Sequence, residues 1–155
     1  MDDRFMARAI HISVENARSG RGGPFGAVIA REGKIIAEAA NSVAACNDPT
    51  AHAEILAIRE ACVRLQQFQL SGCDIYCSCE PCPMCLGAIY WARPNGVFYA
   101  NTSEDAAKIG FDDSLIYREI PLPIGQRKLR MIQMMRDAAQ EAFSIWTALP
   151  KKKAY

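Results

Sequence analysis

The sequence carries Pro81-Cys82-Pro83-Met84-Cys85 near its middle, and His52-Ala53-Glu54 precedes this stretch. Cys82 and Cys85 are spaced so that, on a helix, their side chains share one face. The first turn of a helix also favours thiolate over thiol, because the helix dipole stabilises negative charge there. One imidazole and two thiolates fill three of the four tetrahedral positions around zinc and leave the fourth for water. We therefore predict one Zn²⁺ per chain, held by His52, Cys82 and Cys85.

Glu54 follows the histidine closely and completes the pattern. A metal with an open position lowers the pKa of its bound water from about 15.7 toward about 7. A nearby carboxylate that is not a ligand can then move protons. H-x-E followed by P-C-x-x-C is the signature of zinc nucleobase deaminases. The motif thus predicts a hydrolytic deaminase in which Glu54 is the general acid and base.

Two other interpretations of the cysteines remain open. Cys79, Cys82 and Cys85 form C-x₂-C-x₂-C, the opening of a ferredoxin iron–sulfur motif, but no fourth cysteine follows at the required spacing. A closed structural zinc site would add Cys77 or Cys79 to the three ligands. Both interpretations leave Glu54 without a role, so the sequence favours the catalytic site.

The composition is that of an ordinary enzyme of 155 residues, half of them apolar, with a formal net charge of +1. This length fits one domain spanning 1–155. A charge near zero argues against a surface that tracks long nucleic acid. The chain has no apolar run long enough to cross a membrane and starts with an amphipathic pattern rather than a signal peptide. We expect a cytoplasmic protein in which the odd number of cysteines, seven, and their clustering around 73–85 indicate metal binding rather than disulfides. Cys46, Cys62 and Cys73 are expected to be buried small hydrophobic residues.

Hydrophobic periodicity and turn residues predict alternating helices and strands. Helices are expected at 3–19, 48–66, 81–91, 102–109 and 136–149, and strands at 25–30, 34–40, 75–78, 97–100 and 129–134. Asp48-Pro49 is the expected start of the second helix, since Asp is a good cap and Pro suits the first turn. A hairpin followed by alternating helices and strands predicts an α/β protein, a three-layer α/β/α sandwich with a mixed sheet.

The chain resembles the bacterial guanine deaminases of the small zinc type, within the cytidine-deaminase-like superfamily. The resemblance runs over nearly the whole chain, and its most specific segments are 22–28, 47–54, 78–93, 110–114 and 152–155. The zinc motif alone indicates the superfamily, whereas Phe111-Asp112-Asp113-Ser114 and the terminal tyrosine point to guanine. The resemblance implies the cytidine-deaminase-like fold with a five-stranded sheet. It also implies a homodimer that exchanges its C-terminal segments, about 130–155.

For function, the resemblance implies hydrolysis of guanine to xanthine and ammonia, a step of purine base catabolism or salvage. It implies that Asp113 is a second proton carrier near the leaving amine. Phe25 and Trp91 match aromatic pocket residues, which stack on a flat purine. Asn41 matches a side chain that pairs with the purine edge, and Tyr155 matches a terminal residue that closes the pocket.

These matched residues also have plainer interpretations from residue type alone. Phe25 suits a core position, while Asn41 and Asp113 suit turns or helix caps. Tyr155 follows three lysines, as in a solubilising tail. The resemblance reverses these preferences.

Other substrates remain as alternatives. A related nucleoside (guanosine or cytidine) or an aminated triazine is one, and a tRNA adenosine deaminase, which shares the zinc motif, is another. Basic residues support the second, namely Arg127, Lys128, Arg130 and Lys151-Lys152-Lys153. The low net charge and a tail that closes the pocket favour a small purine substrate, with no membrane and no nucleic-acid partner.

Overall fold

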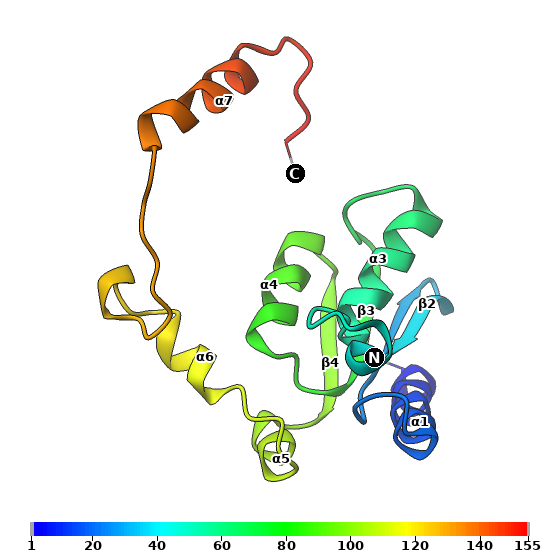
Figure 1. Cartoon of the computed structure of the whole chain (residues 1–155). Helices are drawn as coiled ribbons and strands as arrows, with labels where there is room; N and C mark the ends of the chain where they lie inside the picture. Colours follow the sequence, from blue (N-terminus) through cyan, green and yellow to red (C-terminus); the bar gives the residue numbers. More distant parts are fainter. Residues whose placement is uncertain (1, 155) are drawn as a thin grey trace. The chain divides into compact units, whose positions relative to one another are not determined.

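The computed structural model describes residues 2–154 (Figure 1). The chain forms two compact units, one up to Asp113 and one from Ser114 onward. The first unit contains a mixed four-stranded sheet in the order β2-β1-β3-β4. Its strands are β1 (Gly26–Arg31), β2 (Lys34–Ala40), β3 (Cys73–Cys79) and β4 (Gly96–Asn101). β1 is antiparallel to β2 and β3, whereas β3 and β4 are parallel.

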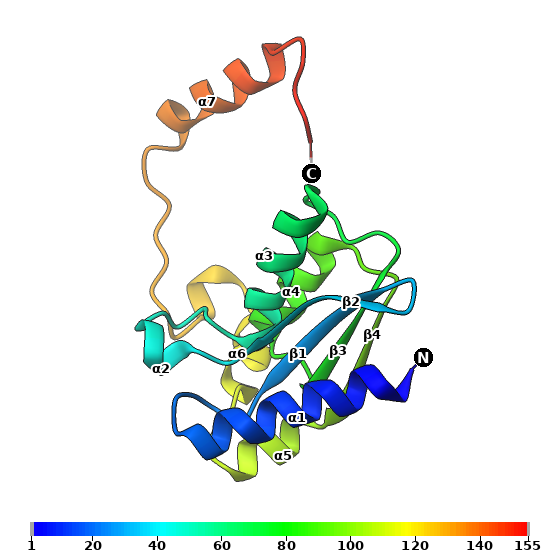
Figure 2. The same ribbon diagram turned by 90° about the vertical axis from the view of Figure 1, so that its right-hand side faces the viewer.

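Helices cover both faces of this sheet, which gives the predicted three layers (Figure 2). α1 (Asp3–Ser19) lies on one face, and α3 (Ala53–Leu65) and α4 (Pro83–Ala92) lie on the other. Alternate residues of β1 serve the two cores, because successive strand residues point to opposite faces. Val28 packs with the α1 side, and Ile29 packs with the α3 and α4 side.

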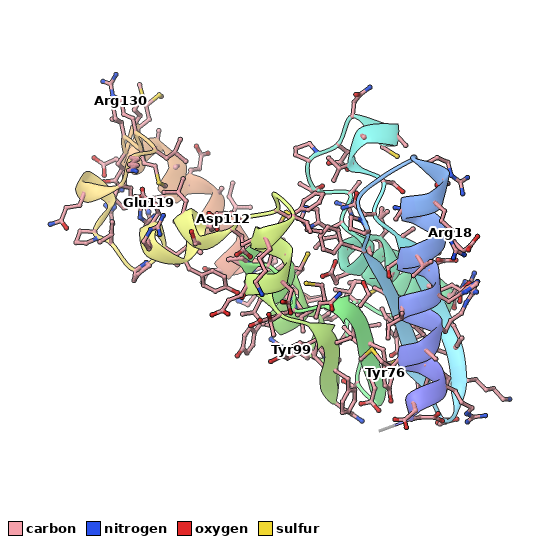
Figure 3. The ribbon with its side chains drawn as sticks, turned by 90° about the horizontal axis from the view of Figure 1, so that it is seen from below. Arg18, Tyr76, Tyr99, Asp112, Glu119 and Arg130 are labelled. Carbon is pink, nitrogen blue, oxygen red and sulfur yellow. The ribbon has the colours of Figure 1, made fainter. Side chains whose placement is uncertain are left out.

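On the α1 side, the core is built from aromatic rings. The Tyr76 ring lies 5.4 Å from the Phe5 ring and 4.9 Å from the Phe98 ring, centroid to centroid. Figure 3 shows Tyr76 beside α1. Gly26 lets α1 approach β1 closely, since a Cβ there would lie 2.5 Å from the Ala9 carbonyl oxygen. The contact fixes the start of β1, which follows directly after Phe25.

The predicted second helix starts at the wrong residue. α3 begins at Ala53, with His52 as its N-cap. Asp48 instead closes a turn, in which its Oδ1 accepts hydrogen bonds from Thr50 N at 2.8 Å and Thr50 Oγ1 at 2.7 Å. Asp side chains favour such turns as readily as helix caps, so the Asp-Pro pair alone could not separate the two. His52 is therefore in extended backbone, with φ −70° and ψ 152°.

Two short helices complete the first unit. α2 (Val43–Cys46) lies in the stretch predicted as a loop between β2 and α3. α5 (Ser103–Lys108) matches the helix predicted at 102–109 and has a capping box, in which the side chains of Thr102 and Asp105 each accept a hydrogen bond from the other's backbone N–H.

The second unit is helical in the residues that the structure describes. It contains α6 (Ser114–Glu119), a 3₁₀ turn at Ile124–Gln126 and α7 (Arg136–Ala148). Arg127 ties the segment between them together, because its guanidinium donates to the carbonyls of Leu122 at 3.0 Å and Ile120 at 2.9 Å. Across the described residues, no helix is long and apolar enough to cross a membrane.

The fifth strand predicted at 129–134 is wrong, and the described sheet has four strands. The apolar residues of this segment led to the prediction of a strand, but a strand needs a neighbouring strand for its backbone hydrogen bonds. The rest of its unit is helical and offers none. Its apolar side chains, such as Leu129 and Met134, are exposed.

Candidate active site

The starts of α3 and α4 bring three metal-binding side chains together. His52 is the N-cap of α3, Cys82 is the N-cap of α4, and Cys85 lies in the first turn of α4. The His52 Nδ1 lies 3.6 Å from the Cys82 Sγ and 3.5 Å from the Cys85 Sγ. All three ligand atoms lie within 4.8 Å of one another. The structure therefore brings the predicted His52, Cys82 and Cys85 together in a group that could hold a metal ion.

These separations fit zinc. With Zn–N near 2.0 Å and Zn–S near 2.3 Å in a tetrahedron, the nitrogen and each sulfur should lie about 3.5 Å apart. The observed distances of 3.6 and 3.5 Å agree with this value. One nitrogen and two sulfurs leave one tetrahedral position for water, which is the arrangement of catalytic rather than structural zinc sites.

Of the two cysteines, Cys82 is the one that favours the thiolate form. A hydrogen bond from the Cys85 thiol, with a second contact to the His52 ring, lowers the pKa of Cys82 to about 4. The contact with Cys82, together with burial, raises the pKa of Cys85. The pair therefore carries a thiolate on Cys82 and keeps its proton on Cys85. Zinc binding displaces that proton, since the metal ligand is the thiolate.

The other two cysteines of this region lie elsewhere. The Cys79 Sγ donates to the Thr102 carbonyl at 3.4 Å, and burial raises its pKa to about 11. Cys77 lies in the core of the sheet, where burial raises its pKa well above the usual value. Both are thiols outside the metal-binding group found among the described residues. This geometry disfavours an iron–sulfur cluster and a closed structural zinc site.

Glu54 lies in the first turn of α3 and is 8% exposed. Its carboxylate contacts the Cys85 thiol, and burial raises its pKa. In a continuous helix, residues two apart point to opposite sides, which would separate Glu54 from His52. The N-cap conformation of His52 removes this conflict, because its backbone is extended rather than helical. A buried carboxyl beside the metal ligands is thus placed to exchange protons with a water in the open position.

Asn41 closes the second strand and is 6% exposed. Its Oδ1 accepts from the backbone N–H groups of Gly23 at 3.3 Å and Val43 at 3.4 Å. The backbone N–H of Asn41 donates to the Phe25 carbonyl at 3.0 Å. The side chain thus acts as a turn former, while its Nδ2 makes no hydrogen bond within the described residues.

Phe25 packs against Phe111, a residue that the sequence analysis did not select. Their rings meet edge to face, with centroids 4.9 Å apart and planes at 88°. A Cβ on Gly23 would lie 3.1 Å from the Phe25 ring and 3.3 Å from the Phe111 ring, so the glycine fits closely beside both. The signal for Phe111 was its place in the Phe-Asp-Asp-Ser segment, next to the predicted Asp113.

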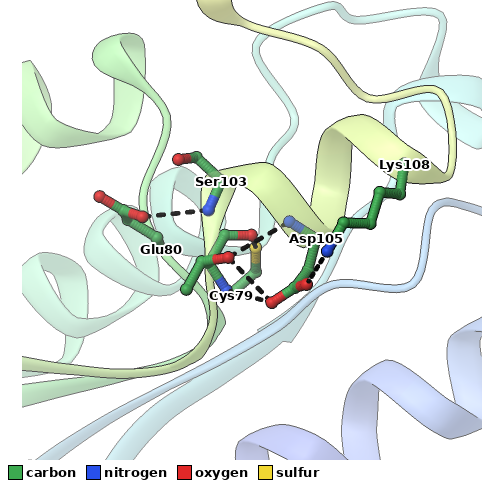
Figure 4. A network of polar contacts seen from close by, with 6 residues as sticks. Cys79, Glu80, Ser103, Asp105 and Lys108 are labelled. Carbon is green, nitrogen blue, oxygen red and sulfur yellow. Dashed lines mark hydrogen bonds and ion pairs between the residues drawn. The ribbon is translucent and has the colours of Figure 1, made fainter.

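Asp113 lies within electrostatic reach of the metal ligands. It is half-buried, and burial, reinforced by the charge of Cys82, raises its pKa. The chain that leads to it is anchored by a polar network at the start of α5 (Figure 4). There, the Glu80 carboxylate accepts from the Ser103 N–H at 3.0 Å, and Lys108 pairs with Asp105 at 3.0 Å. Glu80 directly precedes the Pro81–Cys85 stretch, so one network holds both segments.

Trp91 and Tyr155 are the other two residues predicted to line the pocket. Trp91 is 62% exposed, and it follows Cys85 by six residues, or about 9 Å along α4. Tyr155 lies outside the described residues. Their predicted contacts with a purine stay predictions.

Comparison with known proteins identifies the family. The profile of the cytidine and deoxycytidylate deaminase zinc-binding region matches residues 1–101. The chain is 52% identical over 153 residues to the guanine deaminase of Bacillus subtilis, covering 99% of this chain and 98% of that protein. The crystal structure of guanine deaminase from Bacillus subtilis superimposes with a TM-score of 0.96 at 51% identity, over 100% of this chain and 99% of the other.

Two further relatives show how far the likeness extends. A guanine deaminase from Nitrosomonas europaea has a TM-score of 0.69 at 30% identity, covering 96% of this chain and 86% of that one. The tRNA-specific adenosine deaminase of Aquifex aeolicus is 51% identical, but only over 77 residues, which is 50% of this chain and 51% of that protein. The likeness to guanine deaminases spans both units, whereas the likeness to the Aquifex tRNA enzyme spans half of the chain. The chain belongs to the cytidine and deoxycytidylate deaminase zinc-binding family, and within it to the bacterial guanine deaminases.

Proposed function

We propose that this chain catalyses the hydrolytic deamination of guanine to xanthine and ammonia with one Zn²⁺ per subunit. The observation that carries the proposal is the open His52, Cys82 and Cys85 site with Glu54 buried beside it. The zinc site supports a hydrolytic deaminase. Guanine is supported by identity of 52% to a guanine deaminase over 153 residues.

The chemistry divides between the metal and the side chains around it. When bound, zinc lowers the pKa of a water in its open position. Glu54 takes a proton from the attacking water and delivers it to a ring nitrogen as the new C2–O bond forms. Glu54 then takes the remaining proton from the new C2 hydroxyl, and this one proton passes to the amine with Asp113 as the second carrier. The C2–N bond breaks, C2 keeps its oxygen as a carbonyl, and ammonia leaves. Water and guanine thus give xanthine and ammonia, with the carboxyls returned to their starting state.

We assign substrate binding to four residues. Phe25, held by Phe111, supplies an aromatic surface for the purine, and Trp91 supplies a second. Asn41 offers its Nδ2 to the purine edge, because its Oδ1 is already bonded to the chain. Tyr155 closes the pocket over the base.

The proposed closure predicts a preference for the free base. With zinc-loaded protein, we expect rapid conversion of guanine to xanthine and at least about 100-fold lower kcat/KM for guanosine, because ribose does not fit beneath a closed pocket. Ultraviolet absorbance follows the reaction, with cytidine and an aminated triazine run in parallel. Faster turnover of guanosine would contradict the closure. No measurable turnover of any of the small substrates, combined with salt-sensitive binding of tRNA, would favour the tRNA alternative.

We also propose that the chain works as a homodimer that exchanges about 130–155 between subunits. The second unit exposes many large apolar side chains, which in soluble proteins mark interaction surfaces. They include Leu129, Ile132, Met134, Met135, Phe143 and Trp146. We propose that the chain acts in guanine catabolism in the cytoplasm, a reducing compartment in which cysteines without disulfides, such as the seven here, are usual.

Mixing two inactive variants tests the exchange. Glu54→Gln removes the proton carrier, and Tyr155→Ala removes the closing residue. In an exchanged heterodimer, one site combines the intact Glu54 of one chain with the intact Tyr155 of the other, so activity should rise well above the sum of the two homodimers. Unfolding and refolding the mixture forms heterodimers, and light scattering reports their mass. If no activity appears in verified heterodimers, each tail serves its own chain.

A further inference from the structure

Asn16 of α1 is a buried amide that the reaction does not use. It is 6% exposed, although asparagine usually lies at the surface. Its Nδ2 donates two hydrogen bonds, one to the Gly23 carbonyl at 2.8 Å and one to the Asn41 carbonyl at 2.8 Å. The two acceptors lie on different segments, the loop before β1 and the end of β2. One side chain from α1 therefore fixes both segments at one point.

These two segments carry the contacts that orient the Asn41 side chain. The Gly23 N–H donates to the Asn41 Oδ1 at 3.3 Å, while Asn16 holds the Gly23 carbonyl. Gly22 fits closely in the same place, because a Cβ there would lie 2.2 Å from the Asn41 carbonyl oxygen and 2.9 Å from the Asn16 Nδ2. A change at Asn16 therefore reaches the Asn41 side chain by two short paths, one directly through the Asn41 backbone and one through Gly23.

We propose that Asn16 is a positioning residue for the purine, acting through Asn41. Its two hydrogen bonds hold the backbone at Gly23 and Asn41, so that the Asn41 Oδ1 stays bonded to the chain and its Nδ2 stays directed to the substrate. The inference rests on the proposed function only in naming the purine as the group that Asn41 contacts. The positioning of Asn41 itself is independent of that assignment.

Asn16→Asp tests the donors, because the carboxylate has nearly the same shape but faces two carbonyl oxygens without a hydrogen to donate. The matched control is Ser13→Ala on the same helix. Ser13 is also buried, but its hydroxyl donates only to the Ile10 carbonyl within α1. Asn16→Ala is the second variant. Asn16 lines an open cavity of about 280 Å³ with Arg21 and Ala40, so the truncation enlarges a solvent-accessible space rather than leaving a closed void, and the variant should fold.

The expected signature is a rise in KM for guanine of about tenfold or more in Asn16→Asp, with a smaller change in kcat and unchanged zinc content. In an Asn41→Ala background, the same substitution should cost less than about twofold, because the residue through which it acts is absent. Ser13→Ala should stay within about twofold of the parent. Equal losses in both backgrounds would overturn the proposal.

Amide hydrogen exchange measures the positioning without turnover. The N–H groups of Gly23 and Val43 both donate to the Asn41 Oδ1. Their exchange should quicken at least about tenfold in either Asn16 variant and stay unchanged in Ser13→Ala. Unchanged exchange at both amides in Asn16→Ala would overturn the proposal. If exchange at both amides quickens in the Asn16 variants but the parent protein does not deaminate guanine, the proposed function fails while the positioning role stands.

Discussion

Replacing Glu54 with glutamine is expected to lower guanine deamination by at least about 10³-fold while the zinc content stays at one per chain. The amide keeps the size of the buried side chain but cannot accept and return the proton of the attacking water. The metal ligands are untouched, since Glu54 is outside the group formed by His52, Cys82 and Cys85. Xanthine formation and elemental analysis of the same sample measure the two quantities.

Glu60→Gln is the matched control, because it makes the same chemical change on the same helix. Glu60 pairs with Arg64 one turn further on and lies outside the metal site. Its variant should keep the parent activity. If Glu54→Gln loses zinc together with activity, the carboxyl supports the metal rather than the proton transfer. If it keeps activity, another group carries the proton.

Replacing Cys85 with serine is expected to weaken zinc binding by more than about 100-fold and to remove activity with it. Changes to groups that only support metal ligands already cost about 10- to 100-fold, so the loss of a ligand itself should cost more. Cys85 is fully buried at the start of α4, so no outside thiolate can replace it. Competition with a chromophoric zinc chelator measures the affinity.

Cys79→Ser is the companion variant and separates the interpretations of the cysteine cluster. In the structure, the Cys79 Sγ donates to the Thr102 carbonyl, a contact that a serine hydroxyl can also make. We expect full zinc content and activity within about twofold of the parent. Zinc loss in Cys79→Ser equal to that in Cys85→Ser would instead indicate a closed site with four protein ligands.

Much of the fold follows from local sequence signals. The amphipathic spacing of residues 3–19 predicted α1, and the alternation around Glu32-Gly33 predicted the β1–β2 hairpin. The start of α3 was wrong because Asp48 caps a turn rather than a helix. The strand at 129–134 was wrong because pairing depends on a distant neighbour, which no local pattern reports.

The metal site was predictable because zinc restricts both residue types and spacing. His52, Cys82 and Cys85 meet as expected. The two-residue spacing of His52 and Glu54 indicated that the open end of the helix faces the site, but the sequence placed the start of that helix too early, since α3 begins at Ala53. Phe111 and Asn16 were missed because their contacts form only when distant segments meet. Phe111 packs edge to face on Phe25, and Asn16 donates to the carbonyls of Gly23 and Asn41.

The placement of metal ligands at helix N-caps also affects how the chain holds together. His52 and Cys82 lie at either end of a segment that contains α3 and the central strand β3. A metal bound to both closes this segment into a loop, as a disulfide would. For about 30 residues, the entropy that such closure removes raises the free energy of the unfolded chain by roughly 3.6 kcal/mol at 25 °C. Bound zinc would therefore cross-link the starts of α3 and α4, and its removal should lower the stability of the segment between them, which includes β3.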